Sequence, residues 1–303
     1  MAGDLEGKVA VVTGTGRGIA REVALRFAAE GAKVVGVDID AEAAAETVEL
    51  VREAGGEMEA LYPLDLTEEA NAHRLSEFAA EKFGGIDVLY NSAMSMRIGA
   101  IEDLPADDWR FTIENVLTLH YLVTKHAVPH FRARGGGSII FVGSMTGMDF
   151  ASGYAGNLSF LLAYACGKAG ILRMTTVLAN ELAPIGVRVN AISPGATATP
   201  TGLAFYGEPG SEPRRVSEKG TLIPRLGRPS DIAEAALYLA TKRSEWVTGH
   251  NLVVDGGVTA SGGMGPASAE DAAAMEPTVA QFSVVDDAWS TTGVKKRESG
   301  GGD

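Results

Sequence analysis

Short runs of β-branched residues alternate with longer amphipathic segments along most of the chain, and this alternation limits the possible folds more than any other feature. Residues 8–13 (KVAVVT) have the composition of a buried strand, and residues 19–30 then repeat apolar side chains at helical spacing up to Gly31. The same pattern predicts strands at 33–38, 59–65, 86–91, 135–144, 187–192 and 251–255, and helices at 41–54, 68–83, 109–132, 162–182 and 231–240. Because alternating strands and helices form parallel sheets with helices on both faces, we predict an α/β fold of three layers with a doubly wound parallel sheet of about seven strands.

The pattern divides the chain into one domain and a tail. Residues 1–257 contain no break that would indicate a second domain. Residues 258–303 are rich in glycine, alanine, serine and acids and have no strand pattern. This composition is typical of an exposed or loosely packed extension. The alternative is an arm that docks on a neighbouring subunit through Phe282 and Trp289.

Charge and composition exclude several classes of partner. The 303 residues include 26 basic and 39 acidic side chains, a formal net charge of −13, which disfavours nucleic acid. The sequence contains neither a signal-peptide pattern nor an apolar stretch of roughly 18 residues, so we expect no membrane association and a cytoplasmic protein. Cys166 is the only cysteine, which excludes an internal disulfide and fits a reducing compartment.

Two isolated motifs favour ordinary structural roles. His126 and His130 are four residues apart on a predicted helix, a spacing that some metal sites use. Because no acid or third histidine is placed to join them, we interpret them as surface histidines. Cys166 is expected to be a small packing residue on its helix.

A glycine-rich turn, TGTGRGIA, joins the first strand to the first helix. Gly14, Gly16 and Gly18 allow a tight turn whose free amides, together with the positive end of the helix, favour a pyrophosphate. The usual dinucleotide fingerprint would need glycine or alanine at Ile19, and the spacing that fits is Gly14-x-x-x-Gly18-x-Ala20. A purely structural turn is the alternative, but the position after the first strand of the sheet favours a Rossmann-type dinucleotide site.

An acid at the end of the second strand indicates which dinucleotide is bound. Asp38 can accept hydrogen bonds from the ribose hydroxyls of the adenosine and repels a 2′-phosphate, so it favours NAD over NADP. Arg17 acts in the opposite direction, because a cation in the turn can pair with a 2′-phosphate. A carboxylate facing a dianion carries the larger penalty, and we therefore predict NAD.

Further motifs follow in a fixed order, and with them the chain resembles the short-chain dehydrogenase/reductase family over about residues 5–257. The motifs are the glycine turn, Asp65, Asn91-Ser92-Ala93, Asn115, Ser144, Tyr164-x-x-x-Lys168, Pro194-Gly195 with Thr197 and Thr199, Gly227-Arg228-Pro229 and Asp255-Gly256-Gly257. Three residues depart from the family pattern: Ala20, Ser92 and Met94. The resemblance implies an oxidoreductase that acts on CH–OH and C=O groups.

The resemblance also implies roles for individual residues. Tyr164 and Lys168 share one face of a helix, so the lysine cation is expected to lower the pKa of the tyrosine and make it a general base at neutral pH. Ser144 would hydrogen-bond the substrate oxygen, and Asn115 would hold a water that links Lys168 to solvent. Tyr154 is a rival base, but it lacks a lysine four residues later.

The predicted binding residues fall into two sets. The cofactor set is Gly14, Arg17, Gly18, Ile19, Asp38, Asp65, Leu66, Asn91, Ala93, Tyr164, Lys168, Pro194, Gly195, Thr197 and Thr199. The substrate set is Ser144, Met145, Phe150, Tyr154 and Tyr164. The 20 residues from Ser144 to Tyr164 exceed the usual interval of the family, and we interpret the added loop within residues 145–163 as an apolar wall for a ring-bearing substrate, with a surface insertion as the alternative. Residues 199–226 are expected to form a mobile lid.

The sequence therefore predicts an oxidoreductase that transfers a hydride between NAD(H) and a secondary alcohol or ketone, with an apolar or cyclic substrate and no metal. An NADP-dependent ketoreductase and a non-catalytic dinucleotide-binding protein stay open as alternatives. An enoyl reductase of the family would have a wider interval between the tyrosine and the lysine. The resemblance implies a homotetramer, or a homodimer, built on the helices of Asn115 and Tyr164.

Overall fold

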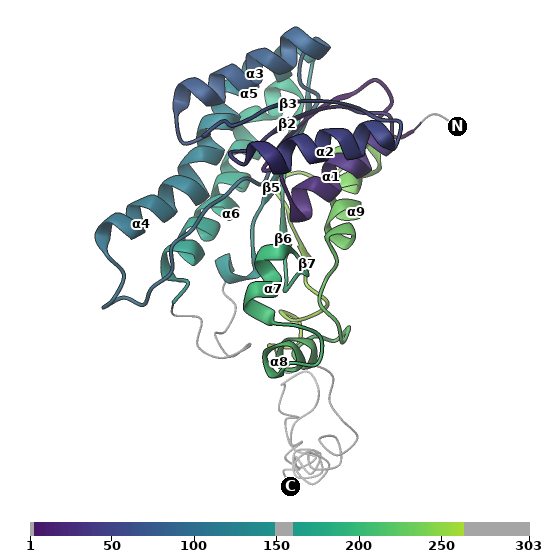
Figure 1. Ribbon diagram of the computed structural model, residues 1–303. Coiled ribbons are helices and arrows are strands. Elements are labelled where there is room, and N and C mark those ends of the chain that lie inside the picture. The colour runs from purple at the N-terminus through teal and green to yellow at the C-terminus, as the bar shows by residue number, and fades with distance from the viewer. Residues whose placement is uncertain (1–2, 149–159, 264–303) are drawn as a thin grey trace, which may run out of the picture. The chain divides into compact units, whose positions relative to one another are not determined.

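The computed structural model describes residues 3–148 and 160–263, and there the predicted parallel sheet is confirmed. Seven strands of the described chain form one parallel sheet in the order β3-β2-β1-β4-β5-β6-β7 (Figure 1). The strands are β1 (Val9–Thr13), β2 (Lys33–Val37), β3 (Glu57–Leu61), β4 (Val88–Asn91), β5 (Gly137–Val142), β6 (Val187–Pro194) and β7 (Asn251–Val254). The order reverses between β1 and β4, so the chain winds outward in both directions from this point.

Helices cover both faces of the sheet. One apolar cluster packs α3 (Glu69–Phe83), α5 (Leu119–Arg134) and α6 (Leu162–Leu182) on one face. A second cluster packs α1 (Gly18–Ala29), α2 (Ala41–Glu53) and α9 (Pro229–Ala240) on the other. Alternate residues of a strand serve opposite clusters, as Ala10 and Val11 do. This is the three-layer arrangement that the sequence predicts.

Two predicted elements have different bounds in the structure. The third strand is Glu57–Leu61, not 59–65, because it pairs in register with β2 from Lys33 to Val37 and ends where β2 ends. Pro63 then has no N–H to continue the ladder. The predicted helix 109–132 begins earlier, as α4 (Ala106–Ile113) after Pro105, and passes through a π-helical turn, η1 (Glu114–Thr118), into α5.

The predicted lid contains two short helices that the sequence analysis missed. They are α7 (Pro200–Tyr206) and α8 (Glu212–Lys219). The two ends of this segment are tied together, since Gly227 N–H donates to Ala196 O at 2.8 Å and Ala198 N–H donates to Gly227 O at 2.8 Å. Residues 199–226 therefore form a loop with a fixed stem.

The polypeptide stays packed beyond the predicted domain end at residue 257. Val258 is fully buried against Met145, and Ile223 N–H donates to Gly256 O at 3.0 Å. Residues 264–303, which hold most of the predicted tail, lie outside the described residues. No helix in the described ranges is long and apolar enough to cross a membrane. The described residues also contain three single-turn 3-10 helices, η2 (Met145–Gly147), η3 (Ala183–Ile185) and η4 (Lys242–Ser244).

Candidate active site

The glycine turn leads directly into the uncapped amino end of α1. Gly14 and Gly18 have φ angles of +79° and +63°, a region that favours glycine. A Cβ on Gly14 would stand 3.0 Å from the Ala93 backbone, and one on Gly18 would stand 3.3 Å from Thr199. The first turn of α1 has no side-chain cap and no acid. Its amides are thus available to an anion, as the sequence predicts.

Asp38 is fixed against this turn by backbone amides. Its Oδ2 accepts from Gly16 N–H at 2.7 Å and its Oδ1 from Asp40 N–H at 2.9 Å. A Cβ at Gly16 would stand 2.8 Å from the Asp38 carboxylate, so glycine is required there by contact. Asp40 caps α2, as expected, by accepting from Ala43 N–H at 3.1 Å. Arg17 reaches the other oxygen of Asp40 at 3.0 Å.

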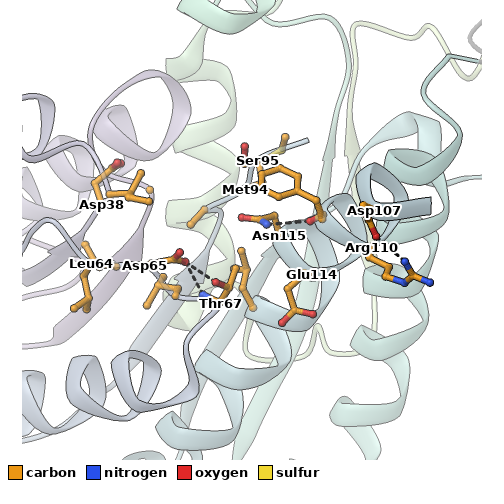
Figure 2. Close-up of a pocket in the computed structure, with 17 residues that line it drawn as sticks. Asp38, Leu64, Asp65, Thr67, Met94, Ser95, Asp107, Arg110, Glu114 and Asn115 are labelled. Atoms are coloured by element: carbon orange, nitrogen blue, oxygen red, sulfur yellow. Dashed lines mark hydrogen bonds and ion pairs between the residues drawn. The ribbon is translucent and has the colours of Figure 1, made fainter. Parts of the chain in front are cut away.

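A cavity of about 670 Å³ lies along the carboxyl ends of β1 to β4. Figure 2 shows Asp38 and Asp65 on one side of it and Asn115, Glu114 and Arg110 on the other. Predicted cofactor residues that line it are Gly14, Asp38, Asp65, Leu66 and Ala93. Asp65 Oδ1 accepts from Thr67 N–H and its hydroxyl at 2.9 and 2.8 Å. Such a volume is typical of a small-molecule site.

Asn91, another predicted cofactor residue, is fully buried and ties elements together. Its Oδ1 accepts from the Thr13 hydroxyl at 3.2 Å, and its Nδ2 donates to His120 O at 3.1 Å. The Thr13 oxygen in turn accepts from the amides of Ser92 and Ala93 at 2.9 and 3.0 Å. Asn91 thus fixes the loop after β4 against β1 and α5, and orients the wall of the cavity.

Asn115 sits on the π-helical turn between α4 and α5. Leu119 N–H donates to Glu114 O, five residues back, which widens the helix at this point. The Asn115 side chain donates to Phe111 O at 2.9 Å and lines the cavity (Figure 2). π-turns inside α-helices occur frequently at functional sites.

Ser144, Tyr164 and Lys168 come together where β5 ends against α6. Ser144 hydrogen-bonds Tyr164, and its Oγ also accepts from Thr146 N–H at 3.2 Å. The ammonium of Lys168 is 5.6 Å from the centre of the Tyr164 ring and donates to Val142 O at 2.6 Å. Lys168 is only 1% exposed. Three of the four predicted catalytic residues therefore form one cluster, while Asn115 lines the cavity, to which none of the other three contributes.

The expected lowering of the tyrosine pKa is wrong for the protein alone. Burial raises the pKa of Tyr164, and the hydrogen bond with Ser144 offsets only part of this effect. Burial also lowers the pKa of Lys168 to about 7, so its cation is only partly present at neutral pH. Desolvation is the largest cause of both shifts.

The predicted substrate wall is only partly visible. Met145 is 5% exposed and packs on Val258, so little of its side chain is open to a substrate. Phe150 and Tyr154 lie outside the described residues. Where the chain is described again, Gly99 N–H donates to Phe160 O at 2.8 Å. The end of the 145–163 loop is thus held by the loop that follows β4.

The remaining predicted cofactor residues, apart from Ile19, lie at or just after the end of β6. Gly195 N–H donates to Val254 O at 3.0 Å, and a Cβ there would stand 2.7 Å from Asp255. The Thr197 hydroxyl donates to Gly195 O at 3.0 Å, and the Thr199 hydroxyl caps α7. Pro194 ends β6. Ile19, like Gly18, belongs to the first turn of α1.

Two minor predictions need correction. His126 and His130 do have acidic partners: their Nε2 atoms lie 3.1 and 3.2 Å from Glu69 and Glu77 of α3. No group of three or more histidine, cysteine, aspartate or glutamate side chains in the described ranges is arranged to hold a metal. Cys166 is exposed in the single chain and not packed.

The sequence analysis missed one buried polar residue, His120. It is 0% exposed, its ring lies 6.2 Å from that of Phe141, and neither ring nitrogen has a well-aligned hydrogen-bond partner. Burial lowers its pKa to about 3, and the Lys168 charge acts in the same direction. The signal was present, because positions 116, 120, 123, 127 and 131 form one buried stripe of the helix.

Comparison with known proteins gives consistent matches over most of the chain. A family model described as enoyl-(acyl carrier protein) reductase matches residues 14–259. The 2,5-dichloro-2,5-cyclohexadiene-1,4-diol dehydrogenase LinX of Sphingobium indicum is 38% identical over 260 residues, which is 85% of this chain and 98% of the relative. The 7alpha-hydroxysteroid dehydrogenase of Escherichia coli K12 is 36% identical over 254 residues, 84% of this chain and 94% of the relative. A solved 7alpha-hydroxysteroid dehydrogenase complexed with NADH and 7-oxo glycochenodeoxycholic acid superimposes with a TM-score of 0.75 at 34% identity, over 84% of this chain and 94% of that one.

Proposed function

The chain belongs to the short-chain dehydrogenase/reductase family and is an oxidoreductase of CH–OH groups, and on that premise we propose that it is an NAD-dependent dehydrogenase of an apolar or cyclic secondary alcohol, with Tyr164 as general acid and base. The observation that carries the proposal is the cluster of Ser144, Tyr164 and Lys168 in a protein whose cavity of about 670 Å³ is lined by Asp38, Asp65 and Asn115. Interconversion of alcohol and ketone needs one proton-transferring group held next to the hydride acceptor, and this cluster can supply it.

The described residues fit a dinucleotide. The uncapped amides of α1 suit the pyrophosphate, and the glycine turn leaves room where any side chain would collide. Asp38 would accept from the hydroxyls of the adenosine ribose, and Asp65 would contact the adenine in the cavity. When bound, NAD supplies the hydride-accepting carbon. Lys168 would hold the nicotinamide ribose.

The protein's own contribution is the handling of the hydroxyl proton. In alcohol oxidation the substrate carbon gives up a hydride, and the Tyr164 oxygen takes the proton of the hydroxyl. Ser144 would hydrogen-bond the same substrate oxygen as charge develops on it. Because burial raises the pKa of Tyr164, the phenol is protonated at neutral pH in the free protein, which suits ketone reduction. Oxidation should therefore accelerate as the pH rises.

Asn115 is proposed as a positioning residue. Its π-turn frees backbone groups at the edge of the cavity, and its side chain is already fixed on Phe111 O. A water held here would connect Lys168 to solvent, so that the proton taken by Tyr164 can leave.

The substrate class is inferred from the relatives. Their names describe dehydrogenases of a chlorinated cyclohexadiene diol and of hydroxysteroids, all of them ring-bearing alcohols.

The exposed apolar side chains Tyr121 on α5 and Val177 on α6 support self-association through these helices. We propose a homotetramer, which light scattering will test.

A substrate screen tests the function directly. Purified protein receives NAD or NADP with cyclic, aromatic and steroid-like secondary alcohols, and the absorbance of reduced nicotinamide is followed. We expect turnover with NAD. Because the matching family model is described as an enoyl reductase, an enoyl thioester with NADH is included. Reduction of that thioester in place of alcohol oxidation would overturn the proposal, and NADH binding without any turnover would favour a non-catalytic protein.

A variant pair tests the role of the tyrosine. Tyr164→Phe removes the proton-transferring oxygen, so kcat should fall by about 100-fold or more, while NADH binding stays the same. Tyr238→Phe changes a tyrosine that is 38% exposed on α9 and serves as the matched control. Full turnover by Tyr164→Phe would contradict the assignment.

A further inference from the structure

Arg17 is the one residue of the glycine turn whose charge opposes the proposed preference for NAD. It directly precedes α1 and follows Gly16, whose N–H donates to Asp38, and its side chain is 60% exposed. A 2′-phosphate on the ribose that Asp38 is proposed to bind would lie near this turn. A free guanidinium here would pair with that phosphate. The structure instead pairs it with Asp40, at 3.0 Å from Nη2 to Oδ2.

Asp40, and not Asp38, is the acid that engages this cation. Both oxygens of Asp38 accept from backbone amides, those of Gly16 and Asp40. Asp40 divides its own oxygens between two partners, because Oδ1 caps α2 at Ala43 N–H and Oδ2 meets Arg17. The cap fixes the carboxylate in place, so the ion pair forms without ordering a second long side chain.

A second cation near the turn is held in the same manner. Arg21 donates to Gly16 O and to Ala43 O, and its Nη2 lies 2.6 Å from Glu46 of α2. Arg17 and Arg21 are therefore both paired with acids: Arg17 with Asp40, which directly precedes α2, and Arg21 with Glu46 of α2. A 2′-phosphate would meet carboxylates and cations that are already paired.

We propose that Asp40 is a second determinant of cofactor choice, which acts by holding Arg17 in an ion pair that a 2′-phosphate would have to break. Asp38 repels the phosphate directly, and Asp40 withholds the cation that could compensate for this repulsion. The inference rests on the proposed dinucleotide site but not on any particular alcohol substrate.

The expected effect follows from the exposure of the pair. Arg17 and Asp40 are 60% and 38% exposed, so solvent screens their attraction. Releasing the cation and removing one negative charge next to the phosphate should tighten NADPH binding by about three- to tenfold. NADH has no group at this position, and its affinity should stay within about twofold.

The test is a double-mutant cycle read by cofactor binding. Asp40→Asn removes the charge and keeps a residue that caps helices well. Arg17→Gln, the double variant and the wild type complete the cycle. Dissociation constants for NADH and NADPH are measured by the fluorescence of the reduced nicotinamide, which needs no substrate. Glu46→Gln is the matched control, because it removes an equal charge from α2 that pairs with Arg21 and not with Arg17, and Arg21 stays held by its bonds to Gly16 O and Ala43 O.

Three outcomes decide the matter. Asp40→Asn should tighten NADPH binding by clearly more in the wild-type background than when Arg17 is already glutamine, where only the loss of the Asp40 charge can act. Glu46→Gln should leave the NADPH to NADH ratio unchanged. An equal gain in the Arg17→Gln background, or no gain at all, would overturn the role of Asp40. Tighter binding of NADPH than of NADH by the wild type would instead refute the proposed NAD preference, and the cycle would still report on Asp40.

Discussion

Replacing Lys168 by methionine should abolish activity and yet stabilise the fold. Lys168 is 1% exposed, and burial lowers its pKa from 10.5 to about 7. The unfolded chain therefore binds more protons than the folded chain between these two values, and the free energy of unfolding must rise with pH across this interval. Methionine fills a similar volume without a charge, so the variant lacks this dependence.

The size of the effect follows from the two pKa values. At pH 7 the shift from 10.5 to about 7 corresponds to about 4 kcal/mol of destabilisation relative to a neutral side chain. By pH 9 this falls to about 2 kcal/mol. The variant also loses the hydrogen bond to Val142 O, which lowers the expected stabilisation by about 1 kcal/mol or more. Lys168→Met should therefore be more stable than the wild type at pH 7, by about 2 kcal/mol or more.

Urea unfolding at pH 7 and pH 9 measures the difference. From pH 7 to pH 9, the free energy of unfolding of the wild type should rise by about 2 kcal/mol relative to that of Lys168→Met. Lys125→Met is the control, because Lys125 is an exposed lysine of α5 whose pKa is raised by Glu69, and it should leave the pH dependence unchanged over this range. Parallel pH dependences for the wild type and Lys168→Met would refute the reasoning.

Three further substitutions have definite expected results. His120→Leu removes a buried group with a pKa of about 3. Between pH 7 and pH 4, the free energy of unfolding of the wild type should therefore fall by about 3 kcal/mol relative to that of the variant, which urea unfolding will measure. Gly18→Ala places a side chain at φ +63° and 3.3 Å from Thr199, and should lower the free energy of unfolding by about 1 kcal/mol and weaken NADH binding in a fluorescence titration. Asp38→Asn should raise kcat/KM with NADP relative to NAD, and an unchanged ratio would argue against the role of this carboxylate.

The fold was predictable because its strands and helices carry strong local patterns. In the strands, β-branched runs such as those of β1 and β5 are buried on both faces and need no tertiary information to be recognised. The third strand was misplaced because Glu57–Leu61 alternates charged and apolar residues at the edge of the sheet, where the pattern is weak. The helices α7 and α8 have seven and eight residues and lie among prolines and glycines, which conceal so short a periodicity.

The grouping of Ser144, Tyr164 and Lys168 could be predicted from the sequence, but the electrostatic environment of these residues could not. Motif spacing brought Ser144, Tyr164 and Lys168 to one place, but it could not give the balance between desolvation and charge that sets their pKa values. That balance depends on side chains from several elements. The π-turn at Asn115 has no sequence signature, and the pairing of Arg17 with Asp40 joins two loops that are far apart in the chain.

The stem of the 199–226 loop has a consequence for how this protein can diversify. Its two backbone hydrogen bonds between Gly227 and the pair Ala196 and Ala198 hold the two ends of the loop together. The entropy of closing a longer loop grows only slowly, by about 0.6 kcal/mol for each doubling of its length. Insertions at residues 207–211, between α7 and α8, should therefore cost little free energy, and a library that varies the length there will test whether this segment influences the substrate range.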